Sequence, residues 1–208
     1  MSNTSTSTAP ASAVVLAGGQ SQRLGQDKSL LFLEGQPLLV RTLDRLAAVS
    51  DDLIVVTNTP QHYEHLHLAA RLVPDERPGV GSLMGIYSGL KAARHGRALV
   101  VACDMPFLNL PLLRHLLAHD PACDVVIPRL GEWPEPLHAV YDKACLPAME
   151  RILARGRRQI VAFFDQVRVC EVAAAEIERF DPQHLSFVNV NTPEDWARVQ
   201  ALAAKANA

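Results

Sequence analysis

The sequence predicts a single-domain α/β fold with a mostly parallel, doubly wound sheet. Short apolar runs recur along the chain, and three of them are rich in β-branched residues without a polar face, as in strands buried inside a parallel sheet. Between these runs lie segments with apolar residues three and four positions apart, typical of helices that cover a sheet. No internal repeat or mid-chain linker divides the 208 residues, a length that suits one well-cored domain.

In the first half of the chain, strands and helices are expected to alternate. AVVLA at Ala13–Ala17, LIVVT at Leu53–Thr57 and ALVVAC at Ala98–Cys103 are short and continuously apolar, so we expect strands there. Pro37–Val49 and Ser82–His95 lie between them and carry the helical period. Strand, helix and strand in this order predict parallel strands with helical crossovers.

The second half continues the alternation. A helix is expected at Leu110–His119, a strand at Asp124–Pro128, a helix at Tyr141–Arg155 and a strand at Val167–Val172. A last helix is expected after Thr192, because a capping threonine is followed there by a proline and then by two acidic residues that favour the positive helix end.

Composition excludes two classes of protein. The net charge is −2 and the basic residues are dispersed, which argues against general nucleic-acid binding, and no apolar run approaches the length of a membrane span. Residues 1–12 have no cationic start and no apolar core of a signal peptide, so they are expected to form a disordered tail before a domain at 13–208 in a cytoplasmic protein. The four cysteines have no zinc or redox spacing and are expected to be reduced and mostly buried.

A glycine loop follows the first expected strand. In LAGGQSQRLGQDK (residues 16–28), Gly18 and Gly19 allow backbone N–H groups to approach a ligand, and Arg23 and Lys28 add positive charge. This combination suits a triphosphate. The spacing is neither that of a P-loop nor that of a dinucleotide-binding motif. A strand-to-helix turn with solvated charges is the alternative.

Two aspartates are candidate contacts for the nucleotide or its metal ion. Asp104 comes after Ala98–Cys103, where a carboxylate can hold Mg²⁺ between phosphate oxygens; the alternative is that it caps the helix beginning near Leu110. Asp75 precedes a glycine-rich stretch that opens a helix, and its carboxylate is placed to contact a base or ribose. A simple turn residue is the alternative for Asp75.

Five motifs in this order resemble the molybdenum cofactor guanylyltransferase (MobA) family. They are the glycine loop, VPDERPGVGSLMGI, ACDMPF, EPLHAVY and FVNVNTPEDW. The resemblance covers about Ala13 to Ala201 and implies a Rossmann-like nucleotidyltransferase fold of the GT-A type. The glycine loop alone indicates only the wider superfamily. Asn189 and Asn191 in the last motif favour guanylyl over cytidylyl transfer.

The resemblance also implies the site residues. Nucleotide binding is expected at Leu16, Ala17, Gly18, Gly19, Lys28, Asn58, Asp75 and Asp104, with Mg²⁺ on Asp104 and with Thr57 as the alternative to Asn58. Leu24 stands where the family often has Met, and Ser82-Leu83-Met84 replaces the commoner Pro-Leu-Ala. The second departure leaves the shape of the base-side loop open.

The implied reaction joins GMP from GTP to the phosphate of molybdenum-molybdopterin and releases pyrophosphate. Asp104 is expected to act through Mg²⁺, and Lys28 and Arg23 to offset charge on the leaving pyrophosphate. The expected partners besides these substrates are apo-molybdoenzymes or their chaperones, with no nucleic acid and no membrane. Cytidylyl transfer to the same pterin, transfer to a sugar phosphate, and a non-catalytic cofactor carrier are the rival functions.

The acceptor is expected to lie against the second half of the chain, because the nucleotide motifs occupy the first. The polar candidates are His138 in a segment entering a helix, Arg129 after a strand, Arg157 and Arg158 after a helix-ending glycine, and Asn189 and Asn191. For the two arginines, a solvated helix end is the alternative.

Overall fold

The computed structural model describes residues 10–18 and 27–206. Its ten described strands are β1 (Ala11–Leu16), β2 (Phe32–Leu33), β3 (Gln36–Pro37), β4 (Leu53–Val56), β5 (Arg71–Val73), β6 (Arg97–Ala102), β7 (Val125–Leu130), β8 (Trp133–Pro134), β9 (His138–Asp142) and β10 (Val169–Ala173). Its α-helices are α1 (Leu38–Leu46), α2 (Ser82–Ala92), α3 (Leu110–Leu117), α4 (Leu146–Ala154), α5 (Ala174–Ile177) and α6 (Pro193–Ala206).

One mostly parallel sheet organises the described residues. Its order is β10-β7-β9-β6-β1-β4-β5, with β8 paired to β7. β1 is parallel to both of its neighbours, β4 and β6, whereas β9 is antiparallel to β6 and β7. The α/β class and the mostly parallel sheet are thus confirmed, and the chain turns to opposite sides of β1 when it forms β4 and β6. Such a switch point is where open α/β sheets bind ligands.

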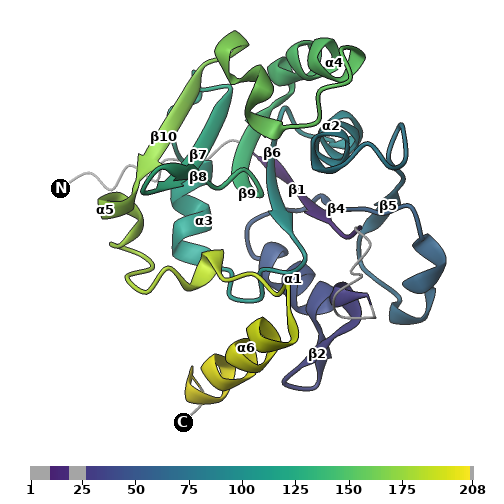
Figure 1. Cartoon of the computed structure of the whole chain (residues 1–208), viewed down its shortest axis with the longest axis vertical. Helices are drawn as coiled ribbons and strands as arrows, with labels where there is room; N and C mark the ends of the chain where they lie inside the picture. Colours follow the sequence, from purple (N-terminus) through teal and green to yellow (C-terminus); the bar gives the residue numbers. More distant parts are fainter. Residues whose placement is uncertain (1–9, 19–26, 207–208) are drawn as a thin grey trace.

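Helices cover both faces of the sheet. α1, α3 and α5 pack with Ala13 and Val15 of β1 on one face, and α2 and α4 pack with Val14 on the other, as the alternation of side chains along a strand requires. Figure 1 shows α2 beside α4, with α6 at the far end of the molecule near β2. α6 joins β2 through a third apolar cluster that includes Leu33, Val190 and Val199. No helix in the described residues is long and apolar enough to cross a membrane.

The end signals of two helices act as expected. The Thr192 hydroxyl accepts a hydrogen bond from the Asp195 N–H (3.1 Å), and the Asp195 carboxylate accepts one from the Thr192 N–H (2.9 Å). This reciprocal cap starts α6. Gly156, at φ +73°, ends α4, and the next N–H reaches back to the Ile152 carbonyl.

Four expectations about the second half and the N-terminus are corrected. Ala11 and Ser12, assigned to the tail, belong to β1 and are buried between neighbouring strands. His138–Asp142 forms strand β9, so the segment before it enters a strand, and α4 begins only at Leu146. The three residues 139–141 are too few to show a period that separates a buried strand from a helix.

The fourth correction concerns the cysteines. Cys123 and Cys170 are joined by a disulfide that ties the turn before β7 to β10, so they are not the reduced thiols expected. Cys103 and Cys145 are free and buried, as expected. Because the two bonded residues are 47 positions apart, their spacing showed no cysteine motif.

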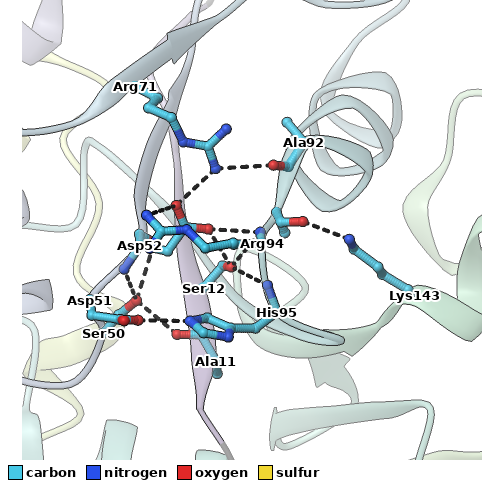
Figure 2. Close-up of polar contacts among 11 residues, drawn as sticks. Ala11, Ser12, Ser50, Asp51, Asp52, Arg71, Ala92, Arg94, His95 and Lys143 are labelled. Atoms are coloured by element: carbon cyan, nitrogen blue, oxygen red, sulfur yellow. Dashed lines mark hydrogen bonds and ion pairs between the residues drawn. The ribbon is translucent and has the colours of Figure 1, made fainter.

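A polar network closes the amino ends of the parallel strands, opposite the switch point (Figure 2). The Asp52 side chain, 1% exposed, accepts hydrogen bonds from the Ser12 hydroxyl (2.6 Å), the Arg94 backbone N–H (2.8 Å) and the Arg71 guanidinium (2.8 Å). Burial alone would raise the pKa of Asp52, but these donors outweigh it and lower the pKa to about 2. The network therefore ties β1 to β4, β5 and the end of α2 through one ionised carboxylate.

Candidate functional site

The candidate site lies where β1, β4 and β6 end. The N–H of Ala17 donates to Val56 at the end of β4, and the carbonyl of Leu16 accepts from Cys103 after β6. Gly18 follows and is exposed, and no atom of a described residue lies within 4 Å of where its Cβ would stand. The first residues of the predicted nucleotide loop are therefore held between two neighbouring strand ends. Gly19 and Arg23, the other predicted residues of this loop, lie outside the described residues.

Lys28 connects two distant parts of the chain. Its ammonium group donates to Asp104 Oδ2 (3.2 Å), just after β6, and to Asn191 Oδ1 (2.6 Å), just before α6. The Lys28 and Asp104 side chains are 17% and 20% exposed, so the charges are partly screened but reachable. We call Lys28, Asp104 and Asn191 the cationic bridge. It combines an ammonium, a carboxylate and an amide, a set of groups that suits phosphate and metal binding.

Asp27 positions Lys28, a role that sequence reasoning missed. The Asp27 carboxylate accepts from the Ser29 N–H (3.0 Å) and caps the short 3₁₀ helix Lys28–Leu30. It also accepts from the hydroxyl of Tyr63 (2.8 Å), and burial raises the pKa of this tyrosine, which keeps the phenol a donor. The only sequence signal for this arrangement is a capping aspartate before Lys28, because Tyr63 is 36 residues away.

Asp104 does not cap the following helix. Asn109 does so, since its side chain accepts from the Leu112 N–H (3.0 Å) at the start of α3. Asp104 Oδ2 contacts Lys28, and in the described part of the chain its other oxygen has no hydrogen-bond partner. The carboxylate is thus available to a cation. The neighbouring Cys103 is not an ionised nucleophile, because burial raises the pKa of its thiol.

Asn58 and Asp75 form a reciprocal pair after β4 and β5. The Asn58 amide donates to Asp75 Oδ2 (2.8 Å), and the Asp75 N–H donates to Asn58 Oδ1 (3.0 Å). Thr57, the alternative to Asn58, is 2% exposed, and its hydroxyl accepts from the Thr59 N–H within the turn. Of the two, Asn58 is the residue that faces the site.

The second oxygen of Asp75 is buried and lacks a partner. Asp75 Oδ1 forms no hydrogen bond with any described residue. A Cβ at Gly85 in α2 would lie 3.6 Å from it and 3.3 Å from both terminal carbons of Leu16. A glycine in α2 therefore keeps a narrow space between Leu16 and Asp75. A buried carboxylate oxygen facing such a space requires a donor, and a ligand can supply it.

A cleft of about 440 Å³ adjoins the cationic bridge through Asn191. Its lining comprises Leu130, Glu135, Gln183, His184, Phe187, Val188, Asn189, Asn191, Asp195 and Arg198. The volume is within the usual range of small-molecule sites. Asn189 and Asn191, both predicted for the acceptor, thus line one cleft, and Asn191 also contacts Lys28.

The other predicted acceptor residues lie elsewhere. His138 is fully buried in β9 and its ring packs on Phe187 at 4.9 Å, so the prediction of a direct acceptor contact is wrong for this residue. Burial lowers the pKa of His138 to about 4 and keeps it neutral. Arg129 lies within β7 and pairs with Glu171 of β10 (2.8 Å). Arg157 and Arg158 are exposed after α4 and do not line the cleft.

Comparisons with known proteins identify the family of this chain. The MobA-like NTP transferase domain matches residues 13–169. The chain is 37% identical to a molybdenum cofactor guanylyltransferase of Desulfosudis oleivorans, covering 90% of this chain and 93% of that protein. It is 36% identical to a probable molybdenum cofactor guanylyltransferase of Pelotomaculum thermopropionicum, covering 93% of each.

A solved structure is similar over nearly the whole chain. The molybdopterin-guanine dinucleotide biosynthesis protein A of Archaeoglobus fulgidus superposes with a TM-score of 0.82 at 30% identity, covering 93% of this chain and 99% of that one. Sequence, fold and the convergence of the predicted motifs on one sheet edge agree. The chain is a nucleotidyltransferase and belongs to the molybdenum cofactor guanylyltransferase (MobA) family.

Proposed function

We propose that this protein transfers GMP from GTP to the phosphate of molybdenum-molybdopterin, releasing pyrophosphate and forming the guanine dinucleotide form of the cofactor. The observation that carries the proposal is the cationic bridge, in which Lys28 joins the strand-end carboxylate of Asp104 to Asn191 beside an open cleft. The cationic bridge supports a nucleoside triphosphate bound on one of its sides and an acceptor bound on the other, with the reacting phosphates between them.

The triphosphate side uses positive charge and glycine. In this proposal the Gly18-Gly19 backbone donates N–H groups to phosphate oxygens, and Lys28 and Arg23 offset charge that develops on the leaving pyrophosphate. Lys28 is suited to this role because its ammonium is already held in place by two oxygen acceptors. A preorganised cation stabilises developing charge without reorienting during the reaction.

Asp104 is proposed to hold Mg²⁺. Its accessible carboxylate fits, since Mg²⁺ prefers oxygen ligands and commonly takes one or two protein carboxylates together with substrate phosphates. When bound, the ion supplies charge neutralisation at the phosphates. The Lys28 ammonium lies 3.2 Å from Asp104 Oδ2. In this proposal Lys28 and the ion held by Asp104 therefore act on the same negatively charged phosphates.

The base side favours guanine. The unpartnered Oδ1 of Asp75 needs a donor, and the N1–H and 2-amino groups of guanine present two adjacent donors to a carboxylate. Cytosine has one amino group beside an acceptor nitrogen and satisfies a carboxylate less well. Asn58 holds Asp75 in place, and Leu16 flanks the same space by reaching the Gly85 position, whereas the Ala17 side chain packs on the opposite face of the sheet.

The proposed chemistry needs no protein nucleophile. An oxygen of the acceptor phosphate attacks the α-phosphorus of GTP, a new phosphorus–oxygen bond forms, and the bond to the β-phosphate breaks to release pyrophosphate. The attacking phosphate is already ionised near neutral pH, so no general base is required. Alignment and charge neutralisation then supply the rate enhancement.

The cleft lined by Asn189 and Asn191 is the proposed acceptor site. Asn191 contacts Lys28, which supports an acceptor phosphate lying next to the bridge. The side chains of Arg157 and Arg158 form no hydrogen bond or ion pair with any described residue, but they lie away from the cleft, so the acceptor contact expected of them stays a prediction. Apo-molybdoenzymes or their chaperones are the proposed recipients of the product.

A labelling experiment tests the proposal. The protein is incubated with Mg²⁺, molybdenum-molybdopterin and either GTP or CTP labelled at the α-phosphate. We expect label in a dinucleotide product from GTP only. Transfer from CTP would indicate a cytidylyltransferase, and binding of pterin without transfer from either nucleotide would indicate a carrier.

Asp75→Asn should lower kcat/KM for GTP roughly 10-fold or more, because one oxygen that pairs with the guanine donors is lost.

A further inference from the structure

Glu135 stands out in the acceptor cleft because its carboxylate has no partner. Its backbone N–H donates to Pro128 (2.9 Å) and its carbonyl accepts from the His138 N–H (3.0 Å), so the hairpin already uses both backbone groups. The carboxylate forms no hydrogen bond or ion pair with any described residue, including Arg198 of the same cleft. Burial raises the pKa of Glu135, which reflects a half-buried charge without compensation.

The other carboxylate of the cleft is already engaged. Asp195 accepts from the N–H groups of Asn191 (3.0 Å) and Thr192 (2.9 Å) as part of the α6 cap. Both of these bonds are accepted by Asp195 Oδ2, so Glu135 is the carboxylate of this cleft with both oxygens free of described partners. It comes from the β7–β9 side of the cleft, whereas Asn191 precedes α6 and contacts Lys28.

We propose that Glu135 selects the acceptor by accepting hydrogen bonds from the 2-amino and N3–H groups of its pterin ring, an inference that rests on the proposed function. These two donors are adjacent on the pyrimidine edge, and a carboxylate with two free oxygens matches them in pairs. With the ring at Glu135, the phosphate end of the acceptor points toward Asn191 and Lys28. The half-buried carboxylate, which has no described partner in the free protein, gains hydrogen-bond donors when a ring with both groups binds. A ring that lacks these donors binds more weakly, because the carboxylate then stays without partners.

The first test measures acceptor kinetics. Glu135→Gln keeps the shape of the side chain but replaces one acceptor oxygen with a donor. We expect the KM for molybdenum-molybdopterin to rise roughly 10- to 100-fold with kcat changed much less, because a charge-assisted contact remote from the reacting phosphate is lost. Pyrophosphate release gives the rate. The thermal shift produced by GTP with Mg²⁺ should be unchanged, which shows that the variant folds and binds nucleotide.

Glu132→Gln is the matched control. Glu132 lies in the same hairpin, three positions away, and is exposed outside the cleft lining. It should keep the wild-type KM. If wild-type protein transfers GMP to the pterin and Glu135→Gln behaves like Glu132→Gln, the inference is overturned while the proposed function stands. If wild-type protein transfers nothing to the pterin, the proposed function fails and the inference fails with it.

A second measurement isolates the donor pair. Pterin and pteridine-2,4-dione, in which a carbonyl replaces the 2-amino group, are compared as competitors of the acceptor. Wild-type protein should bind pterin roughly 10-fold more tightly or better, and Glu135→Gln should lose most of this preference. Glu135→Asp, which keeps the charge on a shorter side chain, should retain part of it. Equal inhibition by both compounds in wild-type protein would contradict a contact between Glu135 and the 2-amino group.

Discussion

At the scale of single residues, the ammonium group of Lys28 organises the site. Its two acceptors, Asp104 and Asn191, are 76 and 163 positions away along the chain. These two hydrogen bonds fix the position of the Lys28 charge, and they also orient the side chains of Asp104 and Asn191. The proposed reaction therefore requires that the glycine loop, the end of β6 and the segment before α6 come together in the folded chain.

We expect Asp104→Ala to abolish most of the activity without unfolding the protein. Asn109, not Asp104, caps α3, so removal of the Asp104 side chain should change the melting temperature by only a few degrees, whereas loss of the proposed Mg²⁺ ligand should lower kcat roughly 100-fold or more. Pyrophosphate release and thermal unfolding measure the two effects. Asp165→Ala, a change at an exposed aspartate of a 3₁₀ segment, is the control. Near-normal turnover by Asp104→Ala would remove this residue from the proposed mechanism.

At the scale of elements, the position of α2 depends on a glycine. A Cβ at Gly89 would overlap Val14 Cγ1 of β1 and lie 3.1 Å from Val56 Cγ2 of β4. The missing side chain lets the helix lie directly on two central strands. The same helix supplies Gly85, which leaves the space at Asp75 Oδ1. Close packing of α2 on β1 and the shape of the proposed base site are therefore coupled.

Gly89→Ala should destabilise the protein by about 1–3 kcal/mol, because overpacking outweighs the helix propensity that alanine adds. Urea unfolding followed by circular dichroism measures the free energy of unfolding. Gly96→Ala is the matched control, since no heavy atom lies within 4 Å of the Cβ that it would add. A stability gain at Gly89 would mean that α2 can move away from β1 at little cost.

Sequence patterns located most elements but misread β9. The expected strands at Leu53 and Ala98 match β4 and β6 within one residue at each start, because continuous β-branched runs bounded by polar residues are distinctive. The segment His138–Asp142 has only three apolar residues between His138 and Asp142 and runs directly into the helix expected at Tyr141–Arg155, so no strand was expected there. β9 runs antiparallel between β6 and β7, and that placement depends on pairing with strands elsewhere in the chain.

At the scale of the whole molecule, the sheet has a functional edge and a structural edge. The carboxyl ends of β1, β4 and β6 meet the proposed substrates, and the amino ends are closed by the Asp52 network (Figure 2). Asp52 accepts hydrogen bonds from groups in β1, in β5 and in the turn after α2, so the ionised carboxylate connects segments that are far apart in the sequence.

The Asp52 network should make stability depend on pH in the acid range. The pKa of Asp52 is lowered from 3.8 to about 2, so the folded state favours the ionised form. Its contribution is complete above about pH 4 and is lost as the pH falls toward 2; it amounts to on the order of 2 kcal/mol. Urea unfolding between pH 5 and pH 2 measures it. Asp52→Asn should be less stable at pH 7 and should show a flatter decline, and a decline as steep as that of the wild type would assign the acid sensitivity to other groups.

By itself the sequence determined the α/β class, most strands and helices, and the residue types of the phosphate site, because apolar periodicity, helix caps and strand-end polar motifs are local patterns. Tertiary structure alone decided the bond between Lys28 and Asn191, the pairing of Asn58 with Asp75, the burial of His138 and the disulfide between Cys123 and Cys170. Each of these brings together or encloses residues through the order of strands in the sheet. Strand order follows from packing over the entire chain, and no short segment encodes it.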